Sequence, residues 1–180
     1  IGDVNNTVIA NTLMANEDRS MGSLVFDVED RTVKSGETFE VKFKAAEKVT
    51  GYQFTLNYSD LELVDIGTSE NMKADNFAIF PEENALTTSW NGNQQAEFTL
   101  KFRARRTAEI SKMLTLSSRI TKAEAYRVVD ESMEPLSISL RFNSKEGSVI
   151  TGVGFELYQN QPNPFVNRTS IGFHLPAATT

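Results

Sequence analysis

Apolar and polar residues alternate along five stretches of the chain, and this alternation is the clearest pattern in the sequence. In the third stretch, Tyr52, Phe54 and Leu56 are separated by Gln53 and Thr55. A period of two is typical of a β-strand that buries one face and exposes the other. The predicted strands cover residues 24–29, 39–45, 52–58, 98–104 and 136–142, with shorter candidates at 61–66, 86–90 and 114–120.

Turn-forming residues separate these stretches. Residues 34–37 (Lys-Ser-Gly-Glu) lie between the first two strands, and Ser-Asp at 59–60 follows the third. Asn91-Gly92-Asn93 lies between two alternating stretches, and Asn-Gly is a strong β-hairpin signal. Many short strands with one solvated face each predict an all-β fold, an antiparallel β-sandwich.

The two ends of the chain differ from this pattern. Residues 1–22 are rich in Asn, Thr and Ala without sustained alternation, and we interpret them as a linker or arm from an upstream module. Residues 23–142 form the sandwich, and residues 143–154, with three glycines and two serines, are expected to be a flexible linker. Ile171, Phe173 and Leu175 alternate as one strand would, so residues 155–180 are interpreted as the beginning of another domain, a truncated β segment.

Composition excludes several kinds of chemistry. The 180 residues include no cysteine and one histidine, which rules out a disulfide framework, thiolate metal sites and a cysteine nucleophile, and leaves any Ser-His-Asp scheme dependent on His174. The 24 acidic against 18 basic residues give a net charge of −6, which argues against nucleic acid or anionic membranes as partners. No apolar run approaches the roughly 18–20 residues of a membrane span. We expect no catalytic residue and no enzyme activity.

The C-terminal segment carries a motif made of Leu157, Tyr158, Asn160, Pro162, Asn163, Pro164 and Phe165. This motif closely resembles the opening of the C-terminal sorting domain of type IX secretion substrates, which Bacteroidetes export across the outer membrane. The resemblance implies the type IX secretion machinery as a partner, and a secreted or cell-surface location on a Gram-negative, Bacteroidetes-type bacterium.

Three segments within residues 23–142 carry a second resemblance: residues 33–41 (Val-Lys-Ser-Gly-Glu-Thr-Phe-Glu-Val), residues 49–58 and the strand at 96–104. Through these segments, residues 23–142 resemble a cohesin-like module. The resemblance implies a nine-stranded jelly-roll sandwich, related to carbohydrate-binding modules, that often binds dockerin modules through one sheet face.

Trp90 and the amides that follow it form one candidate site. Tryptophan beside amides is a common composition of sugar-binding surfaces, so Trp90, Asn91, Asn93 and Gln94 are candidate glycan-binding residues for a polysaccharide. Trp90 also shares the parity of Leu86 on the same stretch, which favours the alternative that its indole belongs to the core.

Clustered acidic residues offer a second candidate. Asp60, Glu62 and Asp65 supply carboxylates from which a calcium site could be built. Ordinary solvated surface is the alternative, and no other metal or cofactor is indicated.

The sequence therefore favours a non-catalytic extracellular binding or structural module of a larger secreted or cell-surface protein. Its partner would be a dockerin-like module or neighbouring subunits. The alternatives are a carbohydrate-binding module of a polysaccharide-degrading or adhesive protein, and a self-assembling adhesion or filament subunit.

Overall fold

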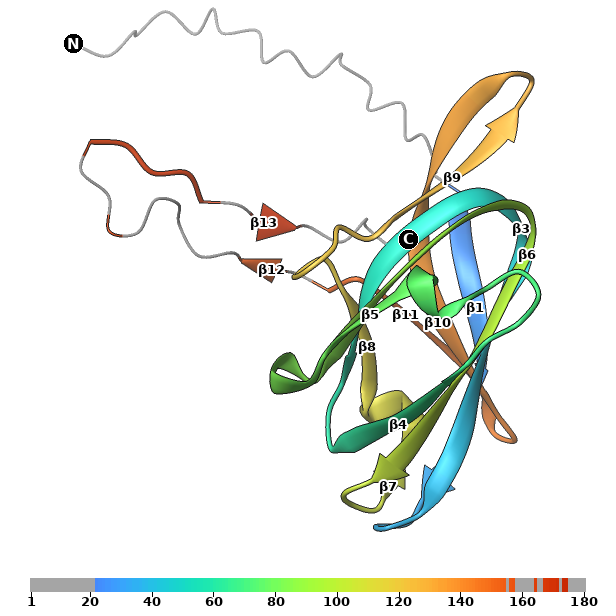
Figure 1. Ribbon diagram of the computed structural model, residues 1–180, viewed down its shortest axis with the longest axis vertical. Helices are drawn as coiled ribbons and strands as arrows, with labels where there is room; N and C mark the ends of the chain where they lie inside the picture. The colour runs from blue at the N-terminus through green and yellow to red at the C-terminus, as the bar shows by residue number, and fades with distance from the viewer. Residues whose placement is uncertain (1–21, 155, 158–163, 165–166, 172, 175–180) are drawn as a thin grey trace, which may run out of the picture.

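A computed structural model describes residues 22–154, 156–157, 164, 167–171 and 173–174. Within these residues the chain is an all-β sandwich, as the alternation predicts (Figure 1). The only helical pieces described are 3-10 turns, η1 (Ala74–Asn76), η2 (Pro81–Glu83) and η3 (Ile110–Lys112). The strands are β1 (Ser23–Glu29), β2 (Thr32–Val33), β3 (Thr38–Tyr58), β4 (Leu61–Gly67), β5 (Phe77–Phe80), β6 (Ala85–Ala104), β7 (Ala108–Glu109), β8 (Leu114–Ser117), β9 (Glu124–Val129), β10 (Ser132–Ser144), β11 (Gly147–Gly152), β12 (Glu156–Leu157) and β13 (Phe173–His174).

Two long antiparallel strands, β3 and β6, serve both layers of the sandwich. They pair along nearly their whole lengths, with register shifts between Lys44 and Lys48 and between Val49 and Gly51. Irregularities of this kind bend a strand and increase its twist. The N-terminal half of β3 and the C-terminal half of β6 therefore belong to one layer, and the remaining halves belong to the other.

The first layer has the strand order β4–β6–β3–β1–β10–β11, and the second has β5–β6–β3 with β8 and β9 following one another along β3. One pairing differs from the antiparallel prediction, because β1 and β10 run parallel from Ser23↔Ser137 to Glu29↔Asn143. The sandwich is therefore built on a mixed sheet, and the all-β architecture itself is confirmed.

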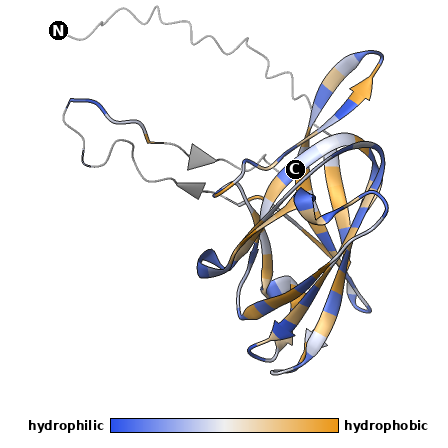
Figure 2. Ribbon diagram, in the orientation of Figure 1, coloured by the Kyte–Doolittle hydropathy of each residue, from blue (hydrophilic) through white to orange (hydrophobic). Residues whose placement is uncertain are grey.

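The core between the layers is rich in phenylalanine. Phe26 packs edge-on against Tyr52, Phe54 and Phe98 at centroid distances of 5.2, 5.6 and 5.9 Å. Phe43 stacks on Phe98 at 4.7 Å. Each such side chain stabilises the fold by about 1.5–3 kcal/mol through burial, with a further contribution from ring geometry. The alternation of apolar and polar positions along the strands is visible in Figure 2.

The expected linker at 143–154 is wrong for most of its length. Residues 147–152 form β11, which pairs antiparallel with β10, and Val153 is 8% exposed at the core. Gly147 has a φ of 141°, a conformation that favours glycine, and it closes the turn after Lys145 and Glu146. The β-branched residues that follow this turn extend the sheet by one strand.

The expected hairpin at Asn91-Gly92-Asn93 is also wrong. Strand β6 continues through these residues without a turn. A Cβ on Gly92 would lie 2.4 Å from Cζ2 of the Trp90 indole, so glycine is needed here for close packing against the ring and not for chain reversal.

Part of the C-terminal segment is described. Glu156 and Leu157 pair with His174 and Phe173 in a small separate sheet, so the single strand predicted around residues 171–175 has a partner. Of the sorting motif, Leu157 and Pro164 are described, whereas Tyr158, Asn160, Pro162, Asn163 and Phe165 lie outside the described residues, as does the arm 1–21. Among the described residues, no helix has the length and apolarity needed to cross a membrane.

Candidate functional site

The outer surfaces of the two layers differ in charge. On the first layer, outward positions carry Lys, Arg, Glu and Asp that pair across strands, such as Lys42 with Glu97 at 2.7 Å. Arg141 holds Asp27 through two hydrogen bonds of 2.6 and 2.8 Å, and this contact keeps the pKa of Asp27 below its usual value. Solvated, mutually paired charges of this kind are typical of a surface that stays in water.

The outer surface of the second layer, which we call the uncharged face, carries small polar side chains instead. The alternation places the buried residues of β3 and β6 on the inner side, so the intervening residues point outward. Among these outward positions Glu124 is the one charged residue. The uncharged face comprises Gly51, Gln53, Thr55, Asn57, Ala78, Phe80, Thr87, Ser89, Asn91, Thr115, Ser117, Glu124 and Tyr126.

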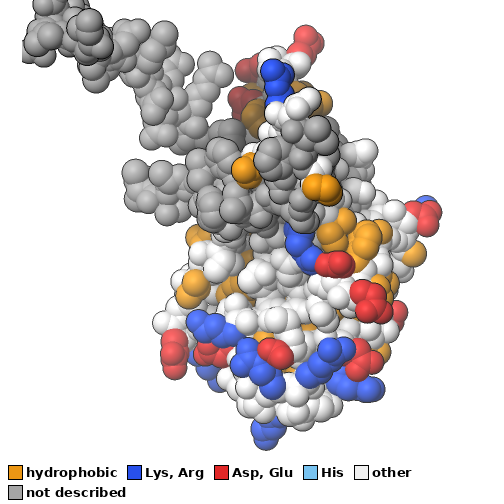
Figure 3. Space-filling model, turned by 90° about the vertical axis from the view of Figure 1, so that its left-hand side faces the viewer, with side chains coloured by type: hydrophobic (Ala, Val, Ile, Leu, Met, Phe, Trp, Pro, Cys, Tyr) orange, Lys and Arg blue, Asp and Glu red, His pale blue; other side chains and the backbone are white. Residues whose placement is uncertain are grey.

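The space-filling view in Figure 3 shows one side of the molecule. Lys, Arg, Asp and Glu side chains are most frequent towards the lower end, and further charged side chains lie in the middle, at the upper end and at the right-hand edge.

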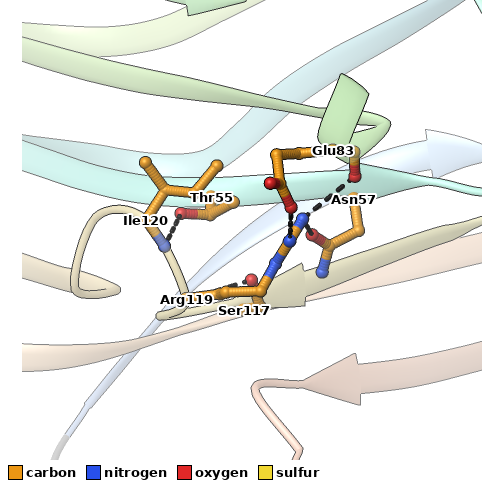
Figure 4. A network of polar contacts seen from close by, with 6 residues as sticks. All are labelled: Thr55, Asn57, Glu83, Ser117, Arg119 and Ile120. Atoms are coloured by element: carbon orange, nitrogen blue, oxygen red, sulfur yellow. Dashed lines mark hydrogen bonds and ion pairs between the residues drawn. The ribbon is translucent and has the colours of Figure 1, made fainter. Parts of the chain in front are cut away.

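A loop of residues 118–123 is fixed across the middle of the uncharged face. Thr55 donates a hydrogen bond to the carbonyl of Thr121 at 3.1 Å and accepts from the Thr121 amide at 2.9 Å. Arg119 binds the Glu83 carboxylate, the Glu83 carbonyl at 3.0 Å and the Asn57 side chain at 3.3 Å (Figure 4). The loop is thereby attached to β3 and to η2, and it buries the Thr55 side chain completely.

Beside this loop the uncharged face is hollowed. The hollow has a volume of about 460 Å³. It is lined by outward residues of three neighbouring strands, by Asn76, and by the largely buried Tyr52 and Trp90. Two cross-strand rows build it. Ser89, Gln53 and Glu124 are directly opposite one another in the first row, and Asn91, Gly51 and Tyr126 in the second.

One carboxylate orders the polar groups of the hollow. Glu124 accepts a hydrogen bond from Gln53 Nε2 at 3.0 Å and pairs with Lys122 Nζ at 2.8 Å. The hydrogen bond from Lys122 is the main cause that lowers the pKa of Glu124, and the hydrogen bond between Tyr126 and Glu124 raises the pKa of the Tyr126 phenol. At neutral pH the hollow therefore contains an ionised acceptor, a protonated phenol and several amides.

Of the predicted glycan-binding residues, one is buried and the other three are exposed. Trp90 is 4% exposed, its ring stacks on Tyr52 at 5.9 Å, and its Nε1 donates to the Asn71 carbonyl at 2.8 Å. The indole is thus in the core, as the alternative interpretation has it, and it presents no face to solvent. Asn91, Asn93 and Gln94 are exposed, and of these only Asn91 lines the hollow.

The three calcium candidates do not converge. Asp60 pairs with Arg106 at 2.5 Å, Glu62 with Arg103 at 3.8 Å, and Asp65 accepts from the Ile66 amide at 2.9 Å. In the described part of the chain, no three His, Cys, Asp or Glu side chains are grouped so that they could hold a metal ion.

Sequence reasoning missed Gln53, Glu124 and Tyr126 as members of one site. Gln53 was visible as an outward residue of its stretch, but no local signal joins it to Glu124, which is 71 positions away along the chain. The register of β9 on β3 makes them neighbours.

Comparisons with known proteins find similarity only at a low level. No family model and no curated protein sequence matches the chain. Solved structures that are similar to it include a non-cellulosomal cohesin from Archaeoglobus fulgidus, with 16% identity and a TM-score of 0.45 over 74% of this chain and 92% of that one.

Two further similar structures come from bacteria. One is the seventh ScaB type I cohesin from Pseudobacteroides cellulosolvens, with 12% identity and a TM-score of 0.43 over 74% of this chain and 94% of that one. The other is a type I cohesin–dockerin complex from Clostridium thermocellum, with 13% identity and a TM-score of 0.43 over 73% of this chain and 94% of that one. At this level of similarity, a function for the chain has to be argued from its own residues.

Proposed function

We propose that this chain is a non-catalytic module that binds a protein partner of the dockerin type on its uncharged face. The observation that carries the proposal is the contrast between the two outer surfaces. The centres of protein interfaces are depleted of charged residues. The strand positions of the uncharged face meet this condition except at Glu124, and the covering loop adds Arg119 and Lys122, each paired with a glutamate, whereas the opposite surface carries charges along its strands.

The rigidity of the uncharged face supports the same function. The loop 118–123 is attached to β3 through Thr55 and to η2 through Arg119, so this part of the face is ordered before any partner arrives. A preorganised surface loses less conformational entropy on binding. The cohesin-like strand pattern at residues 33–41 and 49–58 supports dockerin as the partner class.

Isothermal titration calorimetry of the 180-residue chain against the dockerin modules of its own organism tests the proposal. Thr87→Arg places a charge on the uncharged face, and Thr99→Arg, on the same strand but on the opposite surface, is the matched control. We expect Thr87→Arg to weaken binding by about tenfold or more, equivalent to about 1.4 kcal/mol, and Thr99→Arg to leave it unchanged. Absence of binding by every dockerin, or equal effects of the two variants, would overturn the proposal.

We also propose that the chain is exported by type IX secretion machinery to the cell surface or the medium. The support is the motif from Leu157 to Phe165. Expression in a Bacteroidetes-type host with this machinery should place the chain outside the cell, and a matched strain without the machinery should retain it. A chain ending at residue 154 is the control and should be retained in both strains. The same location in both strains for the 180-residue chain would contradict the proposal.

A neighbouring copy of the chain is a second candidate partner. Strand β11 pairs with β10 on one side, and its adjacent Val149 and Ile150 are 60% and 59% exposed. An edge strand with exposed β-branched residues is suited to strand pairing between chains. Sedimentation at increasing concentration tests this candidate: Ile150→Lys should abolish association, and Val64→Lys, on the edge strand β4, should not. A monomer at every concentration rules it out.

A further inference from the structure

Gly51 lines the hollow on the uncharged face, at the centre of its second cross-strand row. Gly51 lies between Asn91 of β6 and Tyr126 of β9, directly opposite both. A Cβ on Gly51 would lie 2.9 Å from Asn91 Oδ1 and 3.2 Å from the Trp90 carbonyl oxygen. A side chain at residue 51 would therefore displace the Asn91 amide, which lies close to Gly51 on one side, while Tyr126 flanks Gly51 on the other.

Tyr126 supplies the hollow with an aromatic surface. Its side chain is half-buried, so the ring is supported by its surroundings and still accessible. An aromatic ring of this kind can pack against the apolar face of a flat ligand while its hydroxyl remains hydrogen-bonded, here to Glu124.

The remaining lining groups are matched to hydroxyl groups. Amides such as those of Gln53 and Asn91 both donate and accept hydrogen bonds, and the Glu124 carboxylate accepts them. Gln53 and Lys122 fix the orientation of Glu124 before a ligand enters. A ligand with several hydroxyls, each of which donates and accepts, can satisfy these groups together.

Charge further restricts the class of ligand. Glu124 and Lys122 neutralise each other at the rim, so the hollow has no net charge with which to attract an ion. The Glu124 carboxylate would repel an anionic ligand. A cation would be bound weakly, because this carboxylate is already paired with Lys122. The volume of about 460 Å³ falls in the range typical of small-molecule sites.

We propose that the hollow formed by Gly51, Gln53, Asn91, Glu124 and Tyr126 binds one or two units of a neutral saccharide, with a sugar ring stacked on Tyr126. This site differs from the one predicted around Trp90, because Tyr126 replaces the buried indole as the stacking group. The saccharide proposal can be tested separately from the proposed protein partner, because Thr87, the residue substituted in the test for that partner, does not line the hollow.

Amide chemical-shift mapping of the 15N-labelled 180-residue chain tests the proposal. The probes are cellohexaose, xylohexaose, laminarihexaose and mannohexaose, with tri-galacturonic acid as the charged control. We expect at least one neutral oligosaccharide to shift the amide signals of Gly51, Gln53 and Tyr126 in a saturable manner, and the acid to leave them in place. No saturable shift with any of the four, or a larger response to the acid, overturns the proposal.

Three variants locate the interaction. Tyr126→Ala should weaken binding of the responding oligosaccharide by about tenfold, and Tyr126→Phe, which keeps the ring, should weaken it by about threefold or less. Gly51→Ala displaces the Asn91 amide and should also weaken binding, whereas Thr99→Ala on the opposite surface should have no effect. Thermal unfolding of each variant establishes that it is folded. Unchanged affinity in folded Tyr126→Ala would overturn the proposed site even if an oligosaccharide binds elsewhere.

Discussion

Thr55 and Thr121 are joined by two hydrogen bonds, although they lie 66 positions apart in the chain. The Thr55 hydroxyl donates to the Thr121 carbonyl at 3.1 Å and accepts from the Thr121 amide at 2.9 Å, so one side chain satisfies both backbone groups of the covering loop. Thr55 and Arg119 together hold the loop on the uncharged face.

Removing this hydroxyl should release the loop. Thr55→Val keeps the shape of the side chain but leaves the backbone groups of Thr121 without their partner. We expect a loss of about 1–3 kcal/mol of unfolding free energy, measured by urea denaturation, together with faster amide exchange at Ile120 and Thr121. Thr115→Val, on the exposed side of β8, is the matched control and should change stability by less than about 0.5 kcal/mol. Equal effects of the two substitutions would show that Thr55 does not hold the loop.

Gly92 should be intolerant of a side chain. The Cβ of an alanine would lie 2.4 Å from Cζ2 and 2.7 Å from Cη2 of Trp90, in a core without room to move the ring. We expect Gly92→Ala to destabilise the protein by about 1–3 kcal/mol in denaturant unfolding. Gly154→Ala, whose Cβ meets no atom within 4 Å, provides the control. A Gly92→Ala protein as stable as the wild type would mean that the indole is not packed as described.

The single tryptophan gives a direct test of its own burial. Trp90 is the only tryptophan in the sequence, so its fluorescence reports on one environment. Because the indole is 4% exposed, we expect blue-shifted emission and weak quenching by acrylamide in the native protein, and both should change together on unfolding. Strong quenching of the native protein would instead restore Trp90 as a surface residue available to glycans.

Stability should fall at acid pH partly through Asp27. The hydrogen bond from Arg141 lowers the pKa of Asp27 in the folded state, so the folded protein binds a proton at this site less readily than the unfolded chain does. The stabilisation is therefore present above the unfolded pKa of about 3.9 and is lost as the pH falls through the lower folded value. Unfolding free energies measured between pH 2 and 7 should show a weaker acid dependence for Asp27→Asn than for the wild type. Asp75→Asn, at an exposed position of η1, is the comparison and should retain the wild-type dependence.

The alternating strands could be predicted from the sequence, because a strand that is buried on one side has apolar residues at every second position. Phe39, Val41 and Phe43, for example, are all at most 5% exposed, as their spacing indicates. Local sequence was misleading at Gly92, where a hairpin turn was predicted. The glycine is instead needed for close packing against the indole of Trp90, two residues away. Local sequence was misleading again at β11, since small and β-branched residues after Gly147 resemble a linker until β10 is available to pair with them.

The candidate site was harder to predict than the fold because it is made of residues distant in sequence. Asn91 was identified because it follows Trp90 in the sequence. The hollow also needs Gly51 and Tyr126, which are brought beside Asn91 only by the pairing of β3 with β6 and with β9. That register depends on how β9 is laid against β3, which no short stretch of sequence encodes. Trp90 was a candidate to bind the ligand directly, whereas its indole lies in the core below the hollow and stacks on Tyr52.

The return of β11 along β10 has a mechanical consequence. Gly152 ends β11 opposite Ser139, which pairs with Val25 near the start of β1, so the chain enters and leaves the sandwich at the same end of one sheet. Tension applied to the two flanking segments would first peel β11 from β10, one hydrogen bond after another. Only then would the load pass to β1 and β10, and because these strands are parallel, their hydrogen bonds would resist together in shear. A weak, extensible stage would thus precede a strong one.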